Sequence, residues 1–313
     1  MDSRNAARCL PEKPALAQPG GLLAVHAAVL MWGFGGLFGK WIALSPWMIV
    51  FGRLLFATPV LGLVIRLSGR RFALPGAKTG LLILCNGAVL AVHWTTFFHA
   101  VQVSTVAVAL FGYVSAPVFA VFMEPFAFRE PFSRRSLWAA ALIVAGMALI
   151  VPRWEWADAT VQGLAWGLVS GFTFAVLTLV NRFLVRRLDS FALAFYLDGS
   201  ALIVLSPLAF YTWQMPGSGV LILMVLQGVV FTALAHTLFI WGLRTVKVQV
   251  AAIIGSLEPI YGIVLAALLL GEIPTWRIFA GGVLILAAVI WISLAKAQPP
   301  PKPGTGTVAD PQG

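Results

Sequence analysis

The chain has 313 residues, of which 60% are hydrophobic and only 10% are charged, whereas ordinary soluble domains carry about 25% charged residues. So few charges cannot cover the surface of a soluble protein of this length, but a lipid-facing protein does not need them. The net charge of +10 would suit a nucleic-acid partner, yet the basic residues stand singly or in pairs between apolar stretches and form no nucleic-acid-binding module. The composition therefore excludes a soluble domain and predicts a membrane protein without a nucleic-acid partner.

Ten apolar runs are long enough to cross a bilayer, whose hydrocarbon core of about 30 Å requires roughly 20 helical residues. In chain order they span residues 21–44, 46–67, 79–100, 103–125, 134–152, 162–184, 190–212, 219–243, 247–270 and 275–295. The connections are too short to hold a soluble domain. A hydrophilic tail, residues 1–20, precedes the first run, and a tail rich in Pro and Gly, residues 296–313, follows the last. The sequence predicts an all-α polytopic membrane protein with ten transmembrane helices, a cytosolic N-terminal tail and a disordered C-terminal tail.

Lysine and arginine residues are distributed unevenly and orient the predicted helices. One side of the membrane receives 17 of the 21 basic residues, namely Arg4, Arg8, Lys13, Arg66, Arg70, Arg71, Lys78, Arg129, Arg134, Arg135, Arg182, Arg186, Arg187, Arg244, Lys247, Lys296 and Lys302. Because cytoplasmic loops are enriched in Lys and Arg, we expect both termini in the cytoplasm and the protein in the cell inner membrane. Aromatic residues that favour the membrane interface mark the opposite ends: Trp41, Trp47, Trp154, Trp156, Tyr211, Trp213 and Trp276.

An internal repeat appears when the chain is shifted against itself by 142 residues. The shift pairs Lys40 with Arg182, Ala91 with Ala233, Thr95 with Thr237, Phe97 with Phe239, Pro117 with Pro259 and Glu130 with Glu272. Five helices per repeat is an odd number, so the second half must cross the bilayer in the opposite sense. Secondary transporters use such inverted repeats to build two alternating gates from one design. We expect two five-helix repeats, residues 21–152 and 163–295.

The ends of the two halves share a motif. They read VSAPVFAVFMEPFAFREPFSRRSLWAAALIVAGMALI and SLEPIYGIVLAALLLGEIPTWRIFAGGVLILAAVIWI, each with a proline, a glutamate thirteen residues on, and an apolar last helix. With the opening LMWGFGGLFGKW and Arg53 in the second run, the pattern over residues 21–295 resembles the EamA-type repeats of the drug/metabolite transporter superfamily. The resemblance implies ten helices around a central cavity that opens alternately to each side. It implies a cargo such as an amino acid, a nucleotide derivative, a vitamin or a drug, and it favours efflux.

Glu258 is the leading candidate for the functional centre. It lies eleven residues after Lys247, about 16 Å along a helix, and hence near the bilayer midplane. A buried ionisable group costs about 2.5–3.5 kcal/mol on insertion scales, so a function is the default expectation. Pro259 interrupts the helix locally, and Tyr261 shares the face of Glu258 at helical spacing. We expect Glu258 to bind a proton or a substrate amine; the structural alternative is a neutral, hydrogen-bonded carboxyl.

Rings at matching heights in the two third helices form the second group of candidates. His93 and Trp94 lie in the first half, and His236 falls on Trp94 after the 142-residue shift. Histidine can shuttle protons near neutral pH, and an indole can stack on a cation. The alternative is a packing ring whose nitrogen is satisfied by a backbone carbonyl. Trp32 and Tyr113 complete the aromatic part of the candidate substrate-binding set.

Lys40, Arg53 and Asp198 are the remaining intramembrane charges of interest. Lys40 and Arg53 lie toward the outer ends of the first two runs, where their side chains can snorkel to the interface or bind a substrate carboxylate. Asp198 lies mid-bilayer in the seventh run, with no partner that the sequence can name. Glu130 and Glu272 lie at helix junctions, where we expect them to hold helix ends together.

The candidate residues predict a transporter without a bound cofactor and not an enzyme. His93 and His99 lack metal-ligand spacing, no Walker A motif is present, and no Ser/His, metal or paired-Asp constellation stands at motif spacing. We expect a secondary transporter with a small-molecule substrate, protons as a candidate coupling ion, and a homodimer as a candidate assembly. A membrane-embedded enzyme and a lipid flippase of similar fold are the competing interpretations.

Overall fold

The computed structural model describes residues 19–70, 72, 76–128, 134–212, 215–246 and 248–295. The expectations for the two tails fall outside these residues, apart from Pro19 and Gly20, with which the first helix begins. The expectations for Glu130 and Trp213 also fall outside them.

All regular structure in the described residues is helical. In chain order the helices are α1 (Pro19–Gly35), α2 (Phe38–Trp41), α3 (Pro46–Leu67), α4 (Ala77–Val103), α5 (Val106–Tyr113), α6 (Ala116–Phe128), α7 (Arg134–Ile150), α8 (Ala159–Leu184), α9 (Ser190–Tyr211), α10 (Ser218–Gly228), the π-helical η1 (Val229–Leu234), α11 (Ala235–Gly242), α12 (Val248–Gly255), α13 (Glu258–Leu270) and α14 (Trp276–Ala295). Eight stretches of the described chain are long and apolar enough to cross a membrane. They correspond to every predicted run except the fifth and the tenth, which form α7 and α14. The all-helical prediction is confirmed, whereas ten spans remain a prediction.

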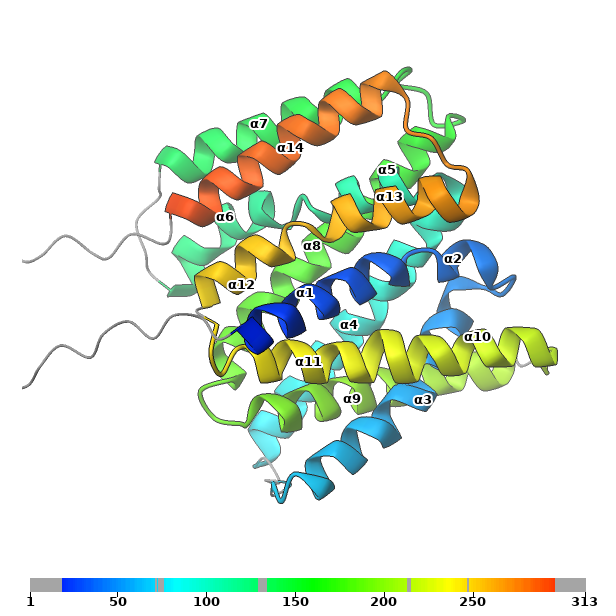
Figure 1. The fold of residues 1–313 in the computed structure, drawn as a ribbon, viewed down its shortest axis with the longest axis vertical. Helices are drawn as coiled ribbons and strands as arrows, with labels where there is room; N and C mark the ends of the chain where they lie inside the picture. The colour runs from blue at the N-terminus through cyan, green and yellow to red at the C-terminus, as the bar shows by residue number, and fades with distance from the viewer. Residues whose placement is uncertain are drawn as a thin grey trace, which may run out of the picture.

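The helices form one bundle with two distinct edges. Figure 1 shows α7 and α14 side by side along one edge, with α3, α9 and α10 along the opposite edge and α1, α4, α8 and α13 between them. One apolar core lies among α3, α4 and α9, around Ile49, Leu54 and Leu197. A second core joins α7 to α14, around Ile143 and Ile285.

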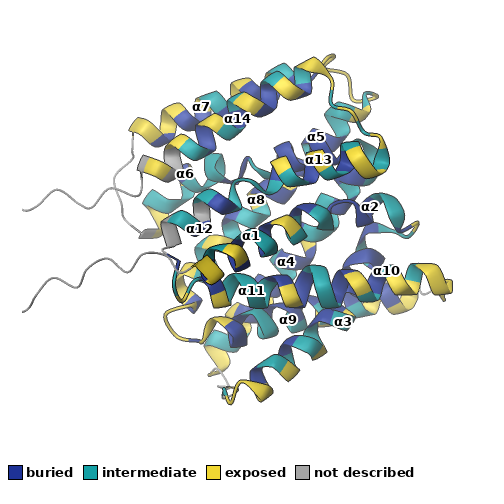
Figure 2. Ribbon diagram, viewed as in Figure 1, coloured by how far each residue is buried: buried dark blue, intermediate teal, exposed yellow. Residues whose placement is uncertain are grey.

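Large apolar side chains cover much of the outside of the bundle. Among the most exposed are Leu23, Leu63, Leu81, Phe126, Phe210 and Leu268. Figure 2 shows that exposed residues recur along the outward faces of the helices, while buried residues turn inward. An apolar exterior is stable only against lipid tails, because water would penalise so much apolar surface. The distribution therefore fits a bundle that is immersed in a bilayer.

Four irregularities interrupt the helices near the middle of the bundle. α1 gives way to α2 at residues 36–37, α5 to α6 at 114–115, and α12 to α13 at 256–257. Pro117 and Pro259 stand just after the last two breaks; proline fits the first turn of a helix but cannot continue the hydrogen-bond ladder before it. The fourth irregularity is η1, a π-helical turn of a kind that is frequent at functional sites. The predicted interruption at Pro259 is confirmed.

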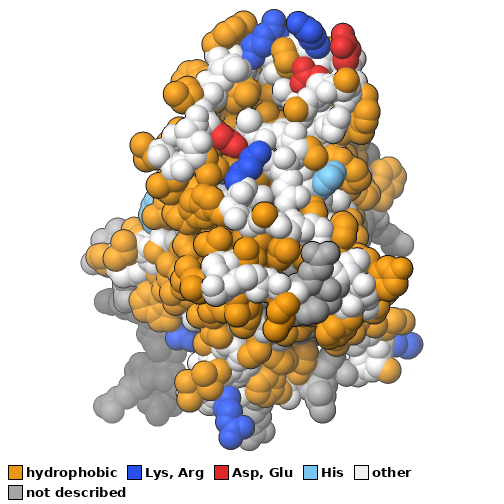
Figure 3. All heavy atoms as spheres, turned by 90° about the vertical axis from the view of Figure 1, so that its right-hand side faces the viewer, with side chains coloured by type: hydrophobic (Ala, Val, Ile, Leu, Met, Phe, Trp, Pro, Cys, Tyr) orange, Lys and Arg blue, Asp and Glu red, His pale blue; other side chains and the backbone are white. Residues whose placement is uncertain are grey.

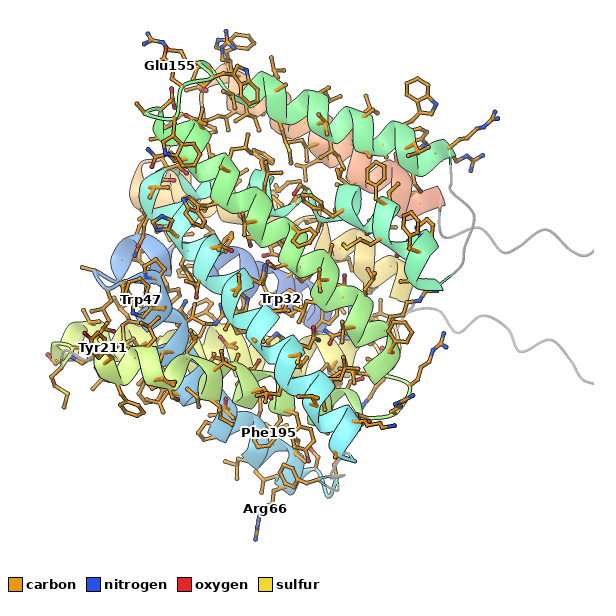
Figure 4. All side chains as sticks on the ribbon, turned by 180° about the vertical axis from the view of Figure 1, so that it is seen from behind. Trp32, Trp47, Arg66, Glu155, Phe195 and Tyr211 are labelled. Atoms are coloured by element: carbon orange, nitrogen blue, oxygen red, sulfur yellow. The ribbon has the colours of Figure 1, made fainter. Side chains whose placement is uncertain are left out.

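The two ends of the described chain lie at one end of the bundle, and aromatic residues expected at the membrane interface lie at the other. In Figure 1 the start of α1 and the end of α14 lie on the same side. In Figure 4 the labelled side chains of Trp47, Tyr211 and Glu155 lie at the opposite end. Figure 3 looks onto that end, where charged side chains are few and hydrophobic side chains dominate. The arrangement agrees with the sequence pattern, but the orientation of the protein in the membrane stays a prediction.

Candidate functional site

A cavity of about 430 Å³ lies inside the bundle. Its size falls within the range of small-molecule sites. Helices from both halves of the chain line it, and its polar or aromatic lining residues are Trp32, Arg53, His93, Trp94, Phe97, Phe98, Tyr113, Phe174, Asn181, Ser190, Asp198, Phe231, His236, Phe239 and Glu258. The labelled Trp32 lies near the centre of the bundle in Figure 4. The helix breaks after α1, α5 and α12 all border this space, because Gly36, Tyr113 and Glu258 line it.

Arg53 is the single lysine or arginine among the lining residues and is 9% exposed. Its guanidinium carbon lies 3.8 Å from the centroid of the Trp94 ring, a cation–π contact. Its Nε donates a hydrogen bond of 3.1 Å to the Thr232 hydroxyl in η1. That hydroxyl donates in turn to the Gln227 carbonyl at 2.8 Å. The Trp94 ring and the hydrogen bond to Thr232 therefore fix the guanidinium, while its terminal nitrogens remain available to a ligand.

Two carboxylates face the same cavity, and both lie within electrostatic reach of Arg53. Neither Asp198 nor Glu258 forms a direct ion pair with Arg53. Asp198 is 2% exposed, and its Oδ2 is buried without a hydrogen-bond partner. Glu258 lies in the first turn of α13, where the helix dipole favours a negative charge. The two acids therefore share the cavity but differ in how the protein stabilises them.

The two cavity histidines also differ in their partners. His93 Nδ1 lies 2.9 Å from the Ser170 carbonyl oxygen. The Ser170 hydroxyl oxygen lies 2.9 Å from the same nitrogen. Nδ1 can donate to the carbonyl when it carries the proton, or accept from the hydroxyl when Nε2 carries it. His236 packs edge-on against Trp32, with ring centroids 5.7 Å apart, and its Nδ1 is buried without a partner. Both rings can therefore exchange a hydrogen bond or a proton with a ligand.

Seven of the nine candidate residues named from the sequence line the cavity: Trp32, Arg53, His93, Trp94, Tyr113, His236 and Glu258. Two do not, and these are Lys40 and Tyr261. The repeat-related residues Trp94 and His236 therefore meet in one space, as their matching heights in the two third helices predict.

Lys40 belongs to a structural contact rather than to the cavity. The break after α1 places it on the short α2, where its Nζ donates to the Ser104 carbonyl and lies 3.6 Å from Glu272 Oε1. Glu272 Oε2 accepts a hydrogen bond of 2.8 Å from the Val106 backbone N–H, at the start of α5. In this arrangement Lys40 makes the structural contact that was the alternative to substrate binding, and substrate binding by Lys40 stays a prediction. The expectation that Glu272 holds helix ends together is confirmed.

Tyr261 is also directed away from the cavity. Its hydroxyl lies 3.0 Å from His26 Nδ1 on α1. Glu258 and Tyr261 lie one turn apart on the same helix, as their spacing predicts, but α1 packs against the Tyr261 side of α13. A Cβ on Gly33 would lie 2.9 Å from the Glu258 carbonyl oxygen, so α1 packs directly against the start of α13 and covers that face. Tyr261 therefore joins two helices beside the site.

Several lining residues were not named as site residues from the sequence. The depth of Asp198 in the bilayer was a signal that it has a function. Its interaction with Arg53 could not be predicted, because the two residues lie far apart in the chain. Thr232, which binds Arg53 but does not itself line the cavity, gave no signal, because a threonine in an apolar run is ordinary. Asn181 binds Asn86 through a hydrogen bond of 2.9 Å. Phe231 and Phe239 line the cavity as part of an aromatic wall, which looks like any apolar helix in the sequence.

The cavity is closed at one end and reaches exposed residues at the other. Val185 and Ser190, which flank the loop between α8 and α9, are the exposed members of the lining. The closed end is filled by Phe34, Phe38, Trp41 and Phe231, which we call the outer aromatic cluster. Phe34 stacks on Phe231 with ring centroids 4.7 Å apart, and Phe38 lies 5.1 Å from the same ring.

The EamA-like transporter family model matches residues 19–151 and 161–294. The protein belongs to the EamA-like transporter family. The two matches start 142 residues apart, which is the offset that aligns the halves of the sequence. The predicted membership of this family is thereby confirmed, with its domain present twice.

Proteins named as transporters or exporters resemble the chain at low identity. The chain is 26% identical to the transporter YxxF of Bacillus subtilis over 276 residues, which cover 87% of this chain and 88% of YxxF. It is 27% identical to the pseudopaline exporter CntI of Pseudomonas aeruginosa over 293 residues, which cover 90% and 98%. It is 27% identical to the inner membrane transporter YicL of Salmonella typhimurium over 288 residues, which cover 88% and 95%. A crystal structure with 17% identity covers 88% of this chain and 96% of its own, with a TM-score of 0.63, and shares the fold.

Proposed function

We propose that the protein is a secondary transporter that exports an amino acid or a related small metabolite across the bacterial inner membrane by alternating access. The observation that supports this most is the central cavity, in which one guanidinium faces two carboxylates without a direct ion pair. Fixed charges inside a membrane are expensive and mark substrate or ion pathways. A cavity enclosed by both family repeats is the site that an alternating mechanism requires.

The proposed architecture is ten membrane-spanning helices in two inverted five-helix repeats, residues 21–152 and 163–295. Two observations support it. The α5–α6 break before Pro117 and the α12–α13 break before Pro259 recur at equivalent positions of the two repeats. The two runs outside the eight apolar spans, α7 and α14, end their respective repeats and pack against each other. Broken helices at the cavity are the recurring device of transporters with inverted repeats.

In this proposal, the arrangement of the helices corresponds to the state in which the cavity is open to the cytoplasm. The accessible end of the cavity borders the α8–α9 loop, which contains Arg186 and Arg187. Basic loops favour the cytoplasmic side. The outer aromatic cluster and the contact of Lys40 with Glu272 close the other end. Export would begin with substrate entry past Val185 and Ser190.

The cavity chemistry and one relative bear on the substrate. Aromatic walls suit an apolar portion of the cargo, and the charged groups suit ionised ends. CntI is a pseudopaline exporter, which agrees with the direction proposed here. Among the substrates implied by the family resemblance, an amino acid or its derivative fits a cavity with charges of both signs better than a neutral drug does.

Counterflow in proteoliposomes tests the proposal directly. Proteoliposomes that contain the purified protein would be loaded with one unlabelled compound at a time, from a panel of amino acids, nucleotide derivatives and vitamins. Uptake of the same compound in labelled form would then be followed. We expect exchange for amino acids or their derivatives and none in protein-free vesicles. Exchange of a vitamin or nucleotide alone would contradict the substrate class. Chemical conversion of the compound would indicate an enzyme, and movement of a labelled lipid between leaflets would indicate a flippase.

Reporter fusions test the orientation. A periplasm-active reporter at Gly217, in the α9–α10 connection, should be active, and the same reporter at Gly304 should be inactive. Both results follow from the uneven distribution of basic residues. Activity at Gly304 without activity at Gly217 would reverse the proposed topology and, with it, the direction assigned to the open end.

A further inference from the structure

We propose that the cavity holds a two-point clamp for a zwitterion, in which Arg53 binds the carboxylate, Asp198 binds the ammonium group, and Thr232 positions Arg53. The proposal rests on the proposed transport function and assigns roles within the same cavity. An α-amino acid presents both charges on one carbon. Its site therefore needs opposite charges that lie close together but are not paired with each other.

The carboxylate arm follows from the geometry of Arg53. Trp94 covers one face of the guanidinium at 3.8 Å, and Nε is occupied by the Thr232 hydroxyl at 3.1 Å. The two terminal nitrogens, which form the fork that binds carboxylates through parallel hydrogen bonds, have no hydrogen-bond partner among the described residues. A guanidinium held in this way is preorganised for a carboxylate.

The ammonium arm follows from the unmet hydrogen-bonding capacity of Asp198. The residue is 2% exposed and its Oδ2 has no partner, which is costly for a buried carboxylate. It lies in the middle of α9 and so gains nothing from a helix terminus. Glu258 differs, because the start of α13 stabilises its charge without any ligand. A donor supplied by the substrate would satisfy Asp198, which leaves Glu258 free to carry a proton.

Thr232 is a positioning residue because it acts through Arg53. The π-helical η1 brings its hydroxyl to the Gln227 carbonyl five residues earlier, at 2.8 Å. The hydroxyl proton is thereby committed to that carbonyl, and the oxygen is directed to accept from Arg53. A Cβ on Gly228 would lie 2.5 Å from the Arg53 carbonyl oxygen, so α3 and the start of η1 are in direct backbone contact. The irregular turn therefore sets both the depth and the rotation of the guanidinium.

Binding measurements with chemically trimmed ligands test each arm separately. The ligands are apolar L-amino acids, their N-acetyl derivatives, which lack the ammonium, and their carboxamides, which lack the carboxylate. Trp32 and Trp94 line the cavity, so quenching of tryptophan fluorescence of the purified protein reports binding. We expect the wild type to prefer the zwitterion over either derivative by roughly tenfold or more, because a site built for polar groups is left unpaired without them.

The variants should separate the two preferences. Asp198→Asn should abolish the preference over the N-acetyl derivative and keep the preference over the carboxamide. Arg53→Gln should do the opposite. Thr232→Val keeps the side-chain shape and should reduce only the preference over the carboxamide, by about threefold to tenfold. The matched control is Glu155→Gln, which removes an exposed carboxylate in the α7–α8 loop at the far end of the bundle. This variant should keep both preferences.

The outcomes distinguish failure of the clamp from failure of transport. Equal wild-type binding of zwitterion and N-acetyl derivative, with counterflow intact, would overturn the clamp and leave the transporter. An Asp198→Asn variant that still rejects the N-acetyl derivative would also overturn it. If no panel member binds and none is exchanged in counterflow, the proposed amino acid transport itself is overturned. If Arg53→Gln fails to fold, Thr232→Val decides the carboxylate arm, since a reduced preference over the carboxamide supports it and no change refutes it. If Asp198→Asn fails to fold, the wild-type preference over the N-acetyl derivative decides the ammonium arm.

Discussion

The α7–α14 pair and the central cavity lie in the same apolar bundle but differ in polar content, helix continuity and packing. Residues 137–150 of α7 and 278–291 of α14 contain no ionisable side chain. Both helices run unbroken, and they meet at Gly146 and Gly281. A Cβ on Gly146 would lie 2.7 Å from the Gly281 carbonyl oxygen, and a Cβ on Gly281 would lie 2.5 Å from the Gly146 carbonyl oxygen. Small residues of this kind allow close approach of membrane helices.

The cavity shows the opposite features. Its walls include one guanidinium, two carboxylates and two imidazoles, and three helix breaks and a π-helical turn border it. Each of these features costs stability in a membrane. The chain therefore places its costly features where its two family repeats meet, whereas α7 and α14 contribute stability without chemistry.

Removal of the Glu258 charge should have the largest effect on transport. Glu258→Gln keeps the shape of the side chain and most of its hydrogen bonding, but it removes the titratable group. We expect active accumulation to be abolished and the remaining exchange to lose its dependence on pH, while the protein still inserts and folds. Expression, thermal stability and flux between about pH 5 and pH 8 would be measured on this variant. Wild-type flux across that range would show that Glu258 is structural and would move the proton-carrying role to His93 and His236.

Gly281→Ala should affect stability instead of transport. The added Cβ would meet the Gly146 carbonyl oxygen at 2.5 Å and Ile150 Cγ1 at 2.6 Å, so α7 and α14 must separate. We expect a loss of about 1–3 kcal/mol in the free energy of unfolding, as for other overpacked interiors, and an unchanged KM.

The matched control for this variant is Gly80→Ala in α4, where a Cβ meets nothing within 4 Å. That change should be neutral or stabilising by about 0.5–1 kcal/mol, since alanine is the better helix former. Thermal unfolding and counterflow on both variants make the measurement. A large rise in KM for Gly281→Ala with unchanged stability would contradict the division between the two regions.

Lys40→Met should have a smaller effect and leave substrate affinity unchanged. The change removes the ion pair with Glu272 and the hydrogen bond to the Ser104 carbonyl. We expect a loss of about 1–2 kcal/mol in stability and easier opening of the closed end, measured as labelling of a cysteine introduced beside the outer aromatic cluster. Arg153→Met, an exposed cation outside the helices, is the control. A tenfold rise in KM for Lys40→Met would restore Lys40 as a substrate-binding residue.

Much of the fold was predictable because a bilayer imposes a simple length and polarity rule on helices. The apolar runs, the break at Pro259 and the doubled family domain all leave local signals in the sequence. Depth in the membrane was also readable, so Glu258, His93 and His236 were identified as cavity candidates without a structure.

The remaining details depend on contacts between segments far apart in the chain. Arg53 meets Trp94 and Thr232 only because α3 packs against α4 and η1. The Tyr261 side chain is kept out of the cavity by the approach of α1 at Gly33 and by its contact with His26, neither of which a helical period contains. Periodicity gives the face of one continuous helix, whereas the site is made from broken helices.

The smallest expected effect compares two tyrosines that each lose one hydroxyl. Tyr113 lines the cavity, whereas the Tyr261 hydroxyl lies 3.0 Å from His26 Nδ1 and outside it. Tyr261→Phe should cost about 1 kcal/mol or less in stability, the usual worth of one hydrogen bond, and should leave KM within about twofold. Tyr113→Phe should instead raise KM by about threefold to tenfold, because Tyr113 belongs to the lining of the proposed substrate cavity. Counterflow kinetics on both variants, with thermal unfolding to confirm folding, gives the comparison. A larger KM change for Tyr261→Phe than for Tyr113→Phe would place the substrate on the α1–α13 contact and would break the boundary drawn here between the cavity and its supports.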